Sequence, residues 1–284
     1  MVTTYLYDTA ETQYADTSHG RIAYRELGSK EGLPLVLLTR FRGTLDHWDP
    51  AFLEVLANVR RVIVVDNAGV GYSTGTPADT VHGMAEVVVE FLDVLKLDKI
   101  DLLGWSMGGF VALDIALDRP GRLHALVIAG SGPGGVPDNP GPDPRVPEHA
   151  GREKSVDEDF LFLFNPDTEV GRAEGLASLR RIDRRLAASR QDASPEALQA
   201  QFNAVGQWNS GKNSAWSRLS ELSVPVLFAN GAHDIMEHPY QTYAMATVVP
   251  NSKTILYGDS GHGFLFQQAD DFGFEVLRFF RQVG

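Results

Sequence analysis

The sequence predicts a doubly wound α/β fold built on a mostly parallel sheet. Short apolar runs recur along the chain without the alternation of a half-exposed strand, and helical patterns separate them. Strands covered by helices on both faces of a parallel sheet have this composition. The alternation of strand and helix patterns stops after residue 130 and resumes near residue 226, which indicates a helical insertion between two strands of the sheet.

Each expected element follows from its local pattern. Two alternating segments, 12–15 and 21–24, predict an antiparallel start to the sheet. The apolar runs predict buried strands at residues 35–38, 62–65, 101–103, 126–129, 226–229 and 252–256. The segments between them predict helices at residues 50–57, 85–95, 109–117, 240–248 and 270–282.

The insertion has a pattern of its own. Residues 132–142 are rich in glycine and proline, which predicts a loop that leaves the sheet. From there to about residue 220 only helical patterns follow, at residues 159–164, 169–190 and 195–208. We therefore expect residues 1–132 to form the first part of a core, residues 133–221 a helical cap, and residues 222–284 the second part of the core.

Composition excludes several classes of function. The 284 residues are 43% hydrophobic, enough to bury one large core, and the net charge of −12 argues against nucleic acid or an anionic membrane as partner. Because there is no cysteine, thiolate chemistry, disulfides and cysteine-based metal sites are excluded. The start of the chain lacks the features of a signal peptide, and no later run is long enough to span a bilayer, so we expect a cytoplasmic protein.

Two serines lie between glycines in the pattern Gly-x-Ser-x-Gly. Ser106 follows an expected strand directly and precedes an expected helix, which is the arrangement of a nucleophile elbow. Its flanking Gly104 and Gly108 suit a turn in which side chains would clash with nearby backbone. Ser73, in contrast, comes well after its strand and is followed by Pro77, which prevents an immediate helix. We predict that Ser106 is a nucleophile and Ser73 a loop residue.

A nucleophilic serine needs a base and a group that orients the base. His262 lies between two glycines on the loop after the strand at 252–256, and Asp234 lies on the loop after the strand at 226–229. The carboxyl ends of parallel strands meet at one edge of a sheet, where Ser106 also lies. The sequence therefore predicts Ser106, Asp234 and His262 as a catalytic triad, and no ligand spacing calls for a metal.

Residues 104–109, 231–234 and 261–264 together resemble the α/β-hydrolase family, most of all the small bacterial carboxylesterases, lactonases and cofactor-free haloperoxidases. The resemblance covers nearly the whole chain. It implies an eight-stranded, mostly parallel sheet flanked by helices, an inserted helical lid, and no cofactor. Serine at the elbow disfavours the haloalkane and epoxide chemistry of this fold.

The segment after the strand at 35–38 departs from the family pattern, which has His-Gly there. This chain has Thr39-Arg40-Phe41-Arg42 instead. By position, Phe41 donates one backbone amide to the oxyanion hole and Met107 the second. Arg40 and Arg42 either bind a substrate carboxylate or pair with local acids such as Asp46; we favour local pairing, the commoner case in folded proteins.

The predicted function is hydrolysis of a small-molecule carboxylic ester or lactone through an acyl-enzyme on Ser106. Aromatic residues of the elbow and the cap are expected to contact the substrate, namely Trp105, Phe162 and Trp208. An amidase of the proline-iminopeptidase type, a C–C bond hydrolase and a perhydrolase remain open as alternatives, and so does a homodimer. A small-molecule receptor without turnover, or a binding module with an inert elbow, is the alternative of another class.

Overall fold

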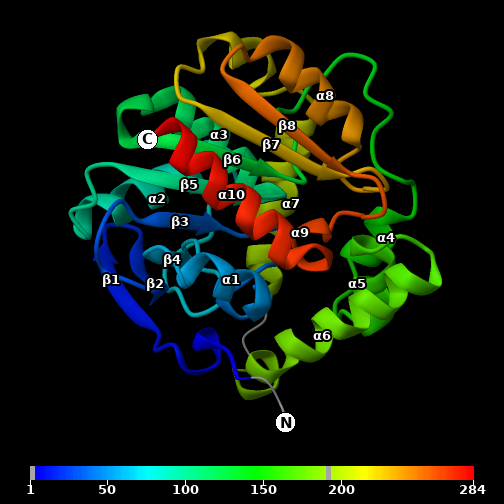
Figure 1. Cartoon of the computed structure of the whole chain (residues 1–284), viewed down its shortest axis with the longest axis horizontal. Coiled ribbons are helices and arrows are strands. Elements are labelled where there is room, and N and C mark those ends of the chain that lie inside the picture. The colour runs from blue at the N-terminus through cyan, green and yellow to red at the C-terminus, as the bar shows by residue number, and fades with distance from the viewer. Residues whose placement is uncertain (1–3, 190–192) are drawn as a thin grey trace.

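A computed structural model describes residues 4–189 and 193–284, and the strands within these residues form one eight-stranded sheet (Figure 1). The strand order is β1-β2-β4-β3-β5-β6-β7-β8. β2 pairs antiparallel with both β1 and β4, and all other pairs are parallel. The α/β fold is confirmed. The strands are β1 Gln13–Thr17, β2 Gly20–Leu27, β3 Leu35–Leu38, β4 Val62–Val65, β5 Ile100–Trp105, β6 Leu123–Ala129, β7 Val226–Gly231 and β8 Ser252–Tyr257.

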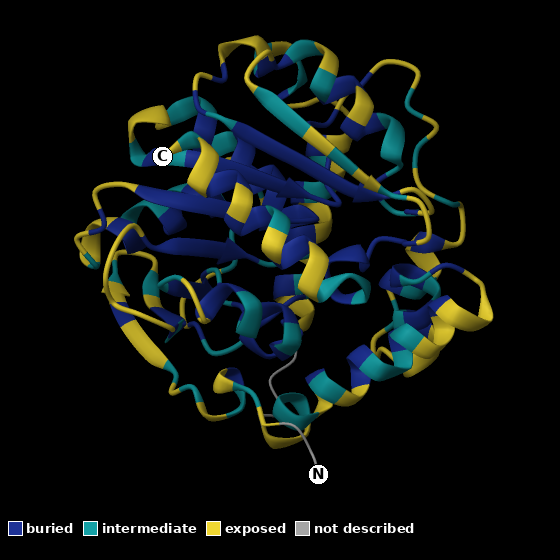
Figure 2. Cartoon of the chain, in the orientation of Figure 1, coloured by how far each residue is buried: buried dark blue, intermediate teal, exposed yellow. Residues whose placement is uncertain are grey.

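The central strands are buried on both faces, as their unbroken apolar runs predict (Figure 2). In β3, Val36 and Leu38 pack into one core, and Leu35 and Leu37 into the other. The first core lies under α2, α3 and α8, and the second lies under α1 and α10. These helices are α1 Pro50–Ala57, α2 Val81–Val94, α3 Met107–Asp118, α8 Pro239–Val248 and α10 Ala269–Val283.

Between β6 and β7 the described residues form four further α-helices: α4 Val146–Ala150, α5 Asp157–Phe164, α6 Glu169–Ser189 and α7 Pro195–Asn209. In Figure 1, α4, α5 and α6 lie together beside the sheet. α7 packs on the face of the sheet that α2 and α3 cover: its Trp208 stacks on Phe110 of α3, with ring centroids 5.5 Å apart. We call α4 to α7 the lid; its division from the core at residues 133 and 221 remains a prediction.

Several boundaries differ from those expected, and α4 was not expected at all. α2 begins at Val81 rather than residue 85 because the Thr80 hydroxyl accepts a hydrogen bond from the Gly83 amide and caps the helix. A short helix, α9 Phe264–Gln267, precedes α10. In the described part of the chain, no helix is long and apolar enough to cross a membrane.

Candidate active site

The turn between β5 and α3 holds Ser106 in a conformation that L-residues rarely adopt, with φ 57° and ψ −126°. Such backbone costs about 1–3 kcal/mol and persists only where the surroundings enforce it. Glycine is required on both sides, because a Cβ atom at Gly104 would collide with the Gly108 carbonyl and one at Gly108 with the Leu38 carbonyl. The Ser106 amide donates to the Ala129 carbonyl at 2.9 Å, which ties the turn to β6. The elbow geometry expected of Ser106 is therefore present.

The loops after β7 and β8 bring Asp234 and His262 together. His262 Nδ1 lies 2.7 Å from Asp234 Oδ2, and both side chains are fully buried. The other Asp234 oxygen accepts hydrogen bonds from the amides of Met236 and Glu237 at 2.8 and 2.9 Å. A carboxylate held this way accepts the proton on Nδ1, which leaves Nε2 as the acceptor. His262 Nε2 is buried and has no hydrogen-bond partner in the described chain.

Ser106 and His262 line one small cavity of about 60 Å³, which we call the catalytic cavity. Its core side includes Arg40 and Phe41, from the turn after β3. Its lid side includes residues of α4 and α5, among them His149, Ala150, Phe160, Leu163 and Phe164. The structure thus brings the predicted Ser106, His262 and Phe41 together, with Asp234 directly behind the imidazole.

The two backbone amides predicted to face an oxyanion lie at the ends of neighbouring strands. Phe41 follows β3, and no hydrogen bond from its amide is found in the described residues. Met107 is the first residue of α3, where amides have no acceptor within the helix and the helix dipole favours negative charge. The Met107 side chain lines a separate cavity of about 30 Å³, so only its amide remains a candidate for the site.

The three aromatic residues predicted to contact substrate do not line the catalytic cavity. Trp208 is 2% exposed, and its Nε1 donates to the Gly132 carbonyl at 3.0 Å. Trp105 is fully buried and donates to the His262 carbonyl at 3.2 Å, so it supports the loop of the histidine. Phe162 lines another cleft. None of the three lines the catalytic cavity in this structure, and their contact with substrate stays a prediction.

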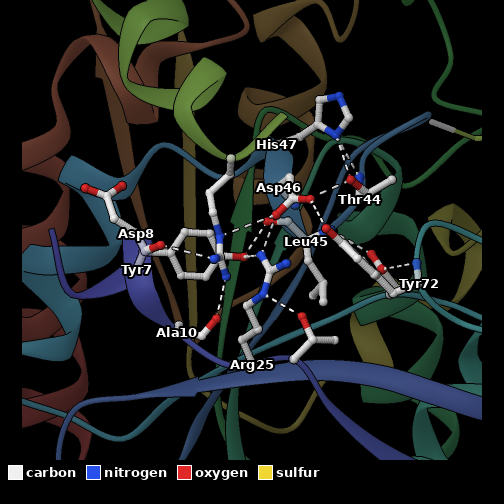
Figure 3. A network of polar contacts seen from close by, with 12 residues as sticks. Tyr7, Asp8, Ala10, Arg25, Thr44, Leu45, Asp46, His47 and Tyr72 are labelled. Atoms are coloured by element: carbon white, nitrogen blue, oxygen red, sulfur yellow. Dashed lines mark hydrogen bonds and ion pairs between the residues drawn. The ribbon is translucent and has the colours of Figure 1, made fainter. Parts of the chain in front are cut away.

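The pairing favoured for Arg40 is corrected. Asp46 pairs with Arg25 of β2 at 2.6 Å and accepts a hydrogen bond from the Tyr72 hydroxyl at 2.6 Å (Figure 3). Arg40 makes no ion pair in the described part of the chain. Arg42 contacts the lid: its amide donates to Gln201 Oε1 of α7 at 2.8 Å, and its guanidinium donates to the carbonyls of residues 150, 152 and 153.

Ser73 has a structural role, in agreement with its loop context. Its hydroxyl accepts a hydrogen bond from the Ala23 amide at 2.8 Å and donates to the Asp66 carbonyl at 2.9 Å. These contacts join the loop after β4 to β2. Both hydrogen-bonding capacities of the hydroxyl are used, and Ser73 does not line the catalytic cavity.

Sequence reasoning missed the lid residues that close the catalytic cavity. His149 of α4 is held by Asp159, with Nδ1 2.8 Å from the carboxylate, and Arg152 pairs with the same carboxylate at 3.0 Å. The Phe160 and Phe164 rings lie one helical turn apart with centroids at 4.8 Å. The aromatic spacing in α5 was a signal for Phe160 and Phe164, but nothing in the sequence around residue 149 marked that histidine.

A larger cleft of about 730 Å³ is lined in part by the Asp234 loop. It is lined by the lid, including Phe162 and Arg145, and by Asp234 and His238 of the core. Ser106 is not among its lining residues, so the catalytic chemistry assigned to Ser106 belongs to the smaller cavity. A group of His82, Asp114 and Asp118 has the spacing of metal ligands, but Arg218 pairs with Asp118 at 2.7 Å, and His82 is exposed.

Glu237 is a buried acid beside the Asp234 carboxylate. Burial, followed by the charge of Asp234, raises the pKa of Glu237 to about 8, although a hydrogen bond from Gln241 at 2.7 Å opposes the shift. A raised pKa means that the folded protein is more stable with Glu237 protonated than with Glu237 ionised. This contribution is fully present below the ordinary pKa of 4.5 and is lost as the pH rises through about 8.

We therefore expect Glu237→Gln to flatten the dependence of stability on pH, because glutamine stays neutral. Urea unfolding at about pH 5.5 and about pH 8.5 should show a smaller loss of unfolding free energy for Glu237→Gln than for the native protein. Glu31→Gln, at an exposed loop position, is the control and should follow the native protein. Parallel losses in the native protein and Glu237→Gln would contradict the assignment.

Comparison with known proteins places this fold in a family. The model of the alpha/beta hydrolase fold family matches residues 34–269, so the chain belongs to that family. An alpha/beta hydrolase fold protein from Chitinophaga pinensis is 34% identical with a TM-score of 0.87, over 96% of this chain and 98% of the other. A thermophilic esterase from Thermogutta terrifontis is 26% identical with a TM-score of 0.76, over 96% and 99%.

A curated relative extends the comparison to another reaction. A 2-hydroxymuconate semialdehyde hydrolase from Pseudomonas sp. (strain CF600) is 29% identical over 253 residues, which are 86% of this chain and 85% of the relative. The family and these relatives support hydrolase activity. Their different substrates leave the bond that is cleaved to be argued from the site.

Proposed function

We propose that the protein is a serine hydrolase that cleaves a carboxylic ester or a lactone. The observation that supports this most is the pairing of Asp234 with His262 Nδ1 at 2.7 Å, while His262 Nε2 stays buried without a partner in the cavity that Ser106 lines. An imidazole in this state has one nitrogen ready to accept the serine proton. The strained turn at Ser106 directs the hydroxyl toward the same space.

In the first half of the reaction, Ser106 Oγ attacks the carbonyl carbon while His262 Nε2 takes its proton. The negative charge that forms on the carbonyl oxygen is stabilised by the amides of Phe41 and Met107, and each such donor is worth about 3 kcal/mol. The Asp234 carboxylate stabilises the imidazolium. When the tetrahedral intermediate collapses, the bond to the leaving oxygen breaks, and that oxygen takes the proton from His262.

In the second half, water replaces the leaving alcohol. His262 removes a proton from the water as its oxygen attacks the acyl carbon, and the same proton passes to Ser106 Oγ when the acyl bond breaks. The free acid and the original enzyme result. A lactone follows the same course, with the hydroxyl end of the opened ring as the leaving group.

The size of the catalytic cavity sets a condition on substrate entry. At about 60 Å³ it is well below the ~300–1,000 Å³ of ordinary ligand pockets. Substrate binding therefore requires movement of the lid residues that close it, such as Phe160 of α5. Contacts from α5 then determine which acyl chains fit.

The proposal is tested by steady-state turnover of purified protein on a matched panel. The panel contains 4-nitrophenyl acetate, a simple lactone, 4-nitroacetanilide and 2-hydroxymuconate semialdehyde. We expect many turnovers on the ester or lactone and much slower turnover on the amide and on the C–C bond. Preference for the semialdehyde would favour C–C bond hydrolysis, the second candidate suggested by the Pseudomonas relative. Stoichiometric binding without turnover would indicate a receptor.

A further inference from the structure

Arg40 is one of the residues around the catalytic cavity. It lines this cavity with Ser106 and His262. Its guanidinium carbon is 4.9 Å from the centroid of the Phe164 ring and 5.9 Å from that of Trp105. The same two rings flank His262, with centroids 5.6 and 5.9 Å from the imidazole. The Arg40 guanidinium and the His262 imidazole therefore lie near the same two aromatic rings.

The Arg40 side chain is not satisfied by the protein. Its Nη1 donates to the Phe41 carbonyl at 2.7 Å, but its Nε is buried and has no hydrogen-bond acceptor in the described chain. No carboxylate pairs with it there. The guanidinium groups of the buried Arg25 and the half-buried Arg181, in contrast, contact Asp46 and Asp49 at 2.6 Å each.

The charges around the catalytic cavity do not compensate Arg40. Burial, followed by the positive charge of Arg42, lowers the pKa of the Arg40 guanidinium to about 9. The carboxylate of Asp159 lines the cavity but is already held by His149 at 2.8 Å and Arg152 at 3.0 Å. An anion in the cavity would supply the missing charge.

We propose that Arg40 binds a carboxylate of the substrate, so that the natural substrate is an ester or lactone with a free acid group near the scissile carbonyl. A guanidinium presents a planar fork that matches a carboxylate. The acid group should lie near the scissile carbonyl, because Arg40 is adjacent in sequence to Phe41. Phe41 is the residue proposed to donate its amide to the oxyanion. This inference rests on the proposed function, whose substrate class it narrows.

Binding to the Ser106→Ala variant tests the inference without turnover. Calorimetry would compare monomethyl succinate with methyl levulinate, in which a methyl group replaces the acidic hydroxyl, so that a neutral methyl ketone of similar size stands in place of the carboxylate. A hydrogen-bonded charge pair predicts that monomethyl succinate binds on the order of 10–100-fold more tightly. In Ser106→Ala/Arg40→Met this preference should disappear, and in Ser106→Ala/Arg40→Lys part of it should remain.

The control is Arg119→Met in the same Ser106→Ala background. Arg119 follows α3 at the end opposite Ser106 and pairs with Glu86 on the surface, so its loss removes one positive charge without touching the cavity. The preference for monomethyl succinate should be unchanged in this variant. If Arg40→Met does not fold, the comparison of the two esters with Ser106→Ala alone still decides, since equal affinities would overturn the inference.

Turnover of the two esters by the native protein separates this inference from the proposed function. Equal affinities in Ser106→Ala, or a preference that survives Arg40→Met, would overturn the carboxylate site even if the native protein hydrolyses both esters. A preference for monomethyl succinate that depends on Arg40 would support the site even if the native protein hydrolyses neither ester. In that second case the proposed function, and not the carboxylate site, would fail.

Discussion

Ser106→Ala should lower kcat for ester hydrolysis by on the order of 10⁶, because it removes the nucleophile and leaves only the amides and the binding surface. The turn itself should persist, since its strain is enforced by the packing of Gly104 and Gly108 rather than by the serine side chain. Hydrolysis of 4-nitrophenyl acetate, followed by release of 4-nitrophenol, measures the effect.

Ser73→Ala is the matched control, because both serines lie in the same Gly-x-Ser-x-Gly pattern. Its hydroxyl bonds Ala23 and Asp66, so we expect a loss of stability of about 1–3 kcal/mol but retention of most activity in the folded protein. Comparable losses of kcat in the two folded variants would show that Ser106 has no special role.

Asp234→Asn should lower kcat by about 10⁴ while leaving the backbone in place. Asparagine can still accept hydrogen bonds from the amides of Met236 and Glu237, but its NH₂ group would face His262 Nδ1. The imidazole would then carry its proton on Nε2, the nitrogen that must accept the proton of Ser106. The loss should therefore appear in kcat, with little change in unfolding temperature.

Asp259→Asn provides the comparison for Asp234→Asn. Asp259 is exposed on the loop that carries His262, and its carboxylate contacts Ser260 rather than the imidazole. Its replacement should leave kcat near the native value. If Asp234→Asn retained activity similar to that of Asp259→Asn, the role assigned to Asp234 would be wrong.

The sequence predicts the positions of those site residues that lie on loops directly after strands. Parallel strands bring their carboxyl ends to one edge, so the loops that carry Asp234 and His262 were expected beside Ser106, and the 2.7 Å contact between the first two agrees with that expectation. The glycines at 104 and 108 marked the turn because a close approach of backbone leaves no room for a side chain.

Features that depend on contacts between distant segments could not be predicted. The sequence predicts that Trp208 contacts substrate, but in the structure Trp208 packs on Phe110, because α7 lies against α3. Arg40 was expected to pair with a nearby acid, but Asp46 is already engaged by Arg25 of β2. Neither outcome can be read from local spacing, since each depends on which segments, distant in the sequence, pack against each other.

The central claim is that Ser106 carries the acyl group during turnover. Rapid acid quenching of the native protein during hydrolysis of 4-nitrophenyl acetate, followed by peptide mass spectrometry, tests it most directly. The account predicts an acetyl group on Ser106 that disappears when the substrate is exhausted and is absent in Ser106→Ala. An acetyl group on Ser73 or on another residue with the same kinetics, or turnover with no acylated peptide at all, would contradict it.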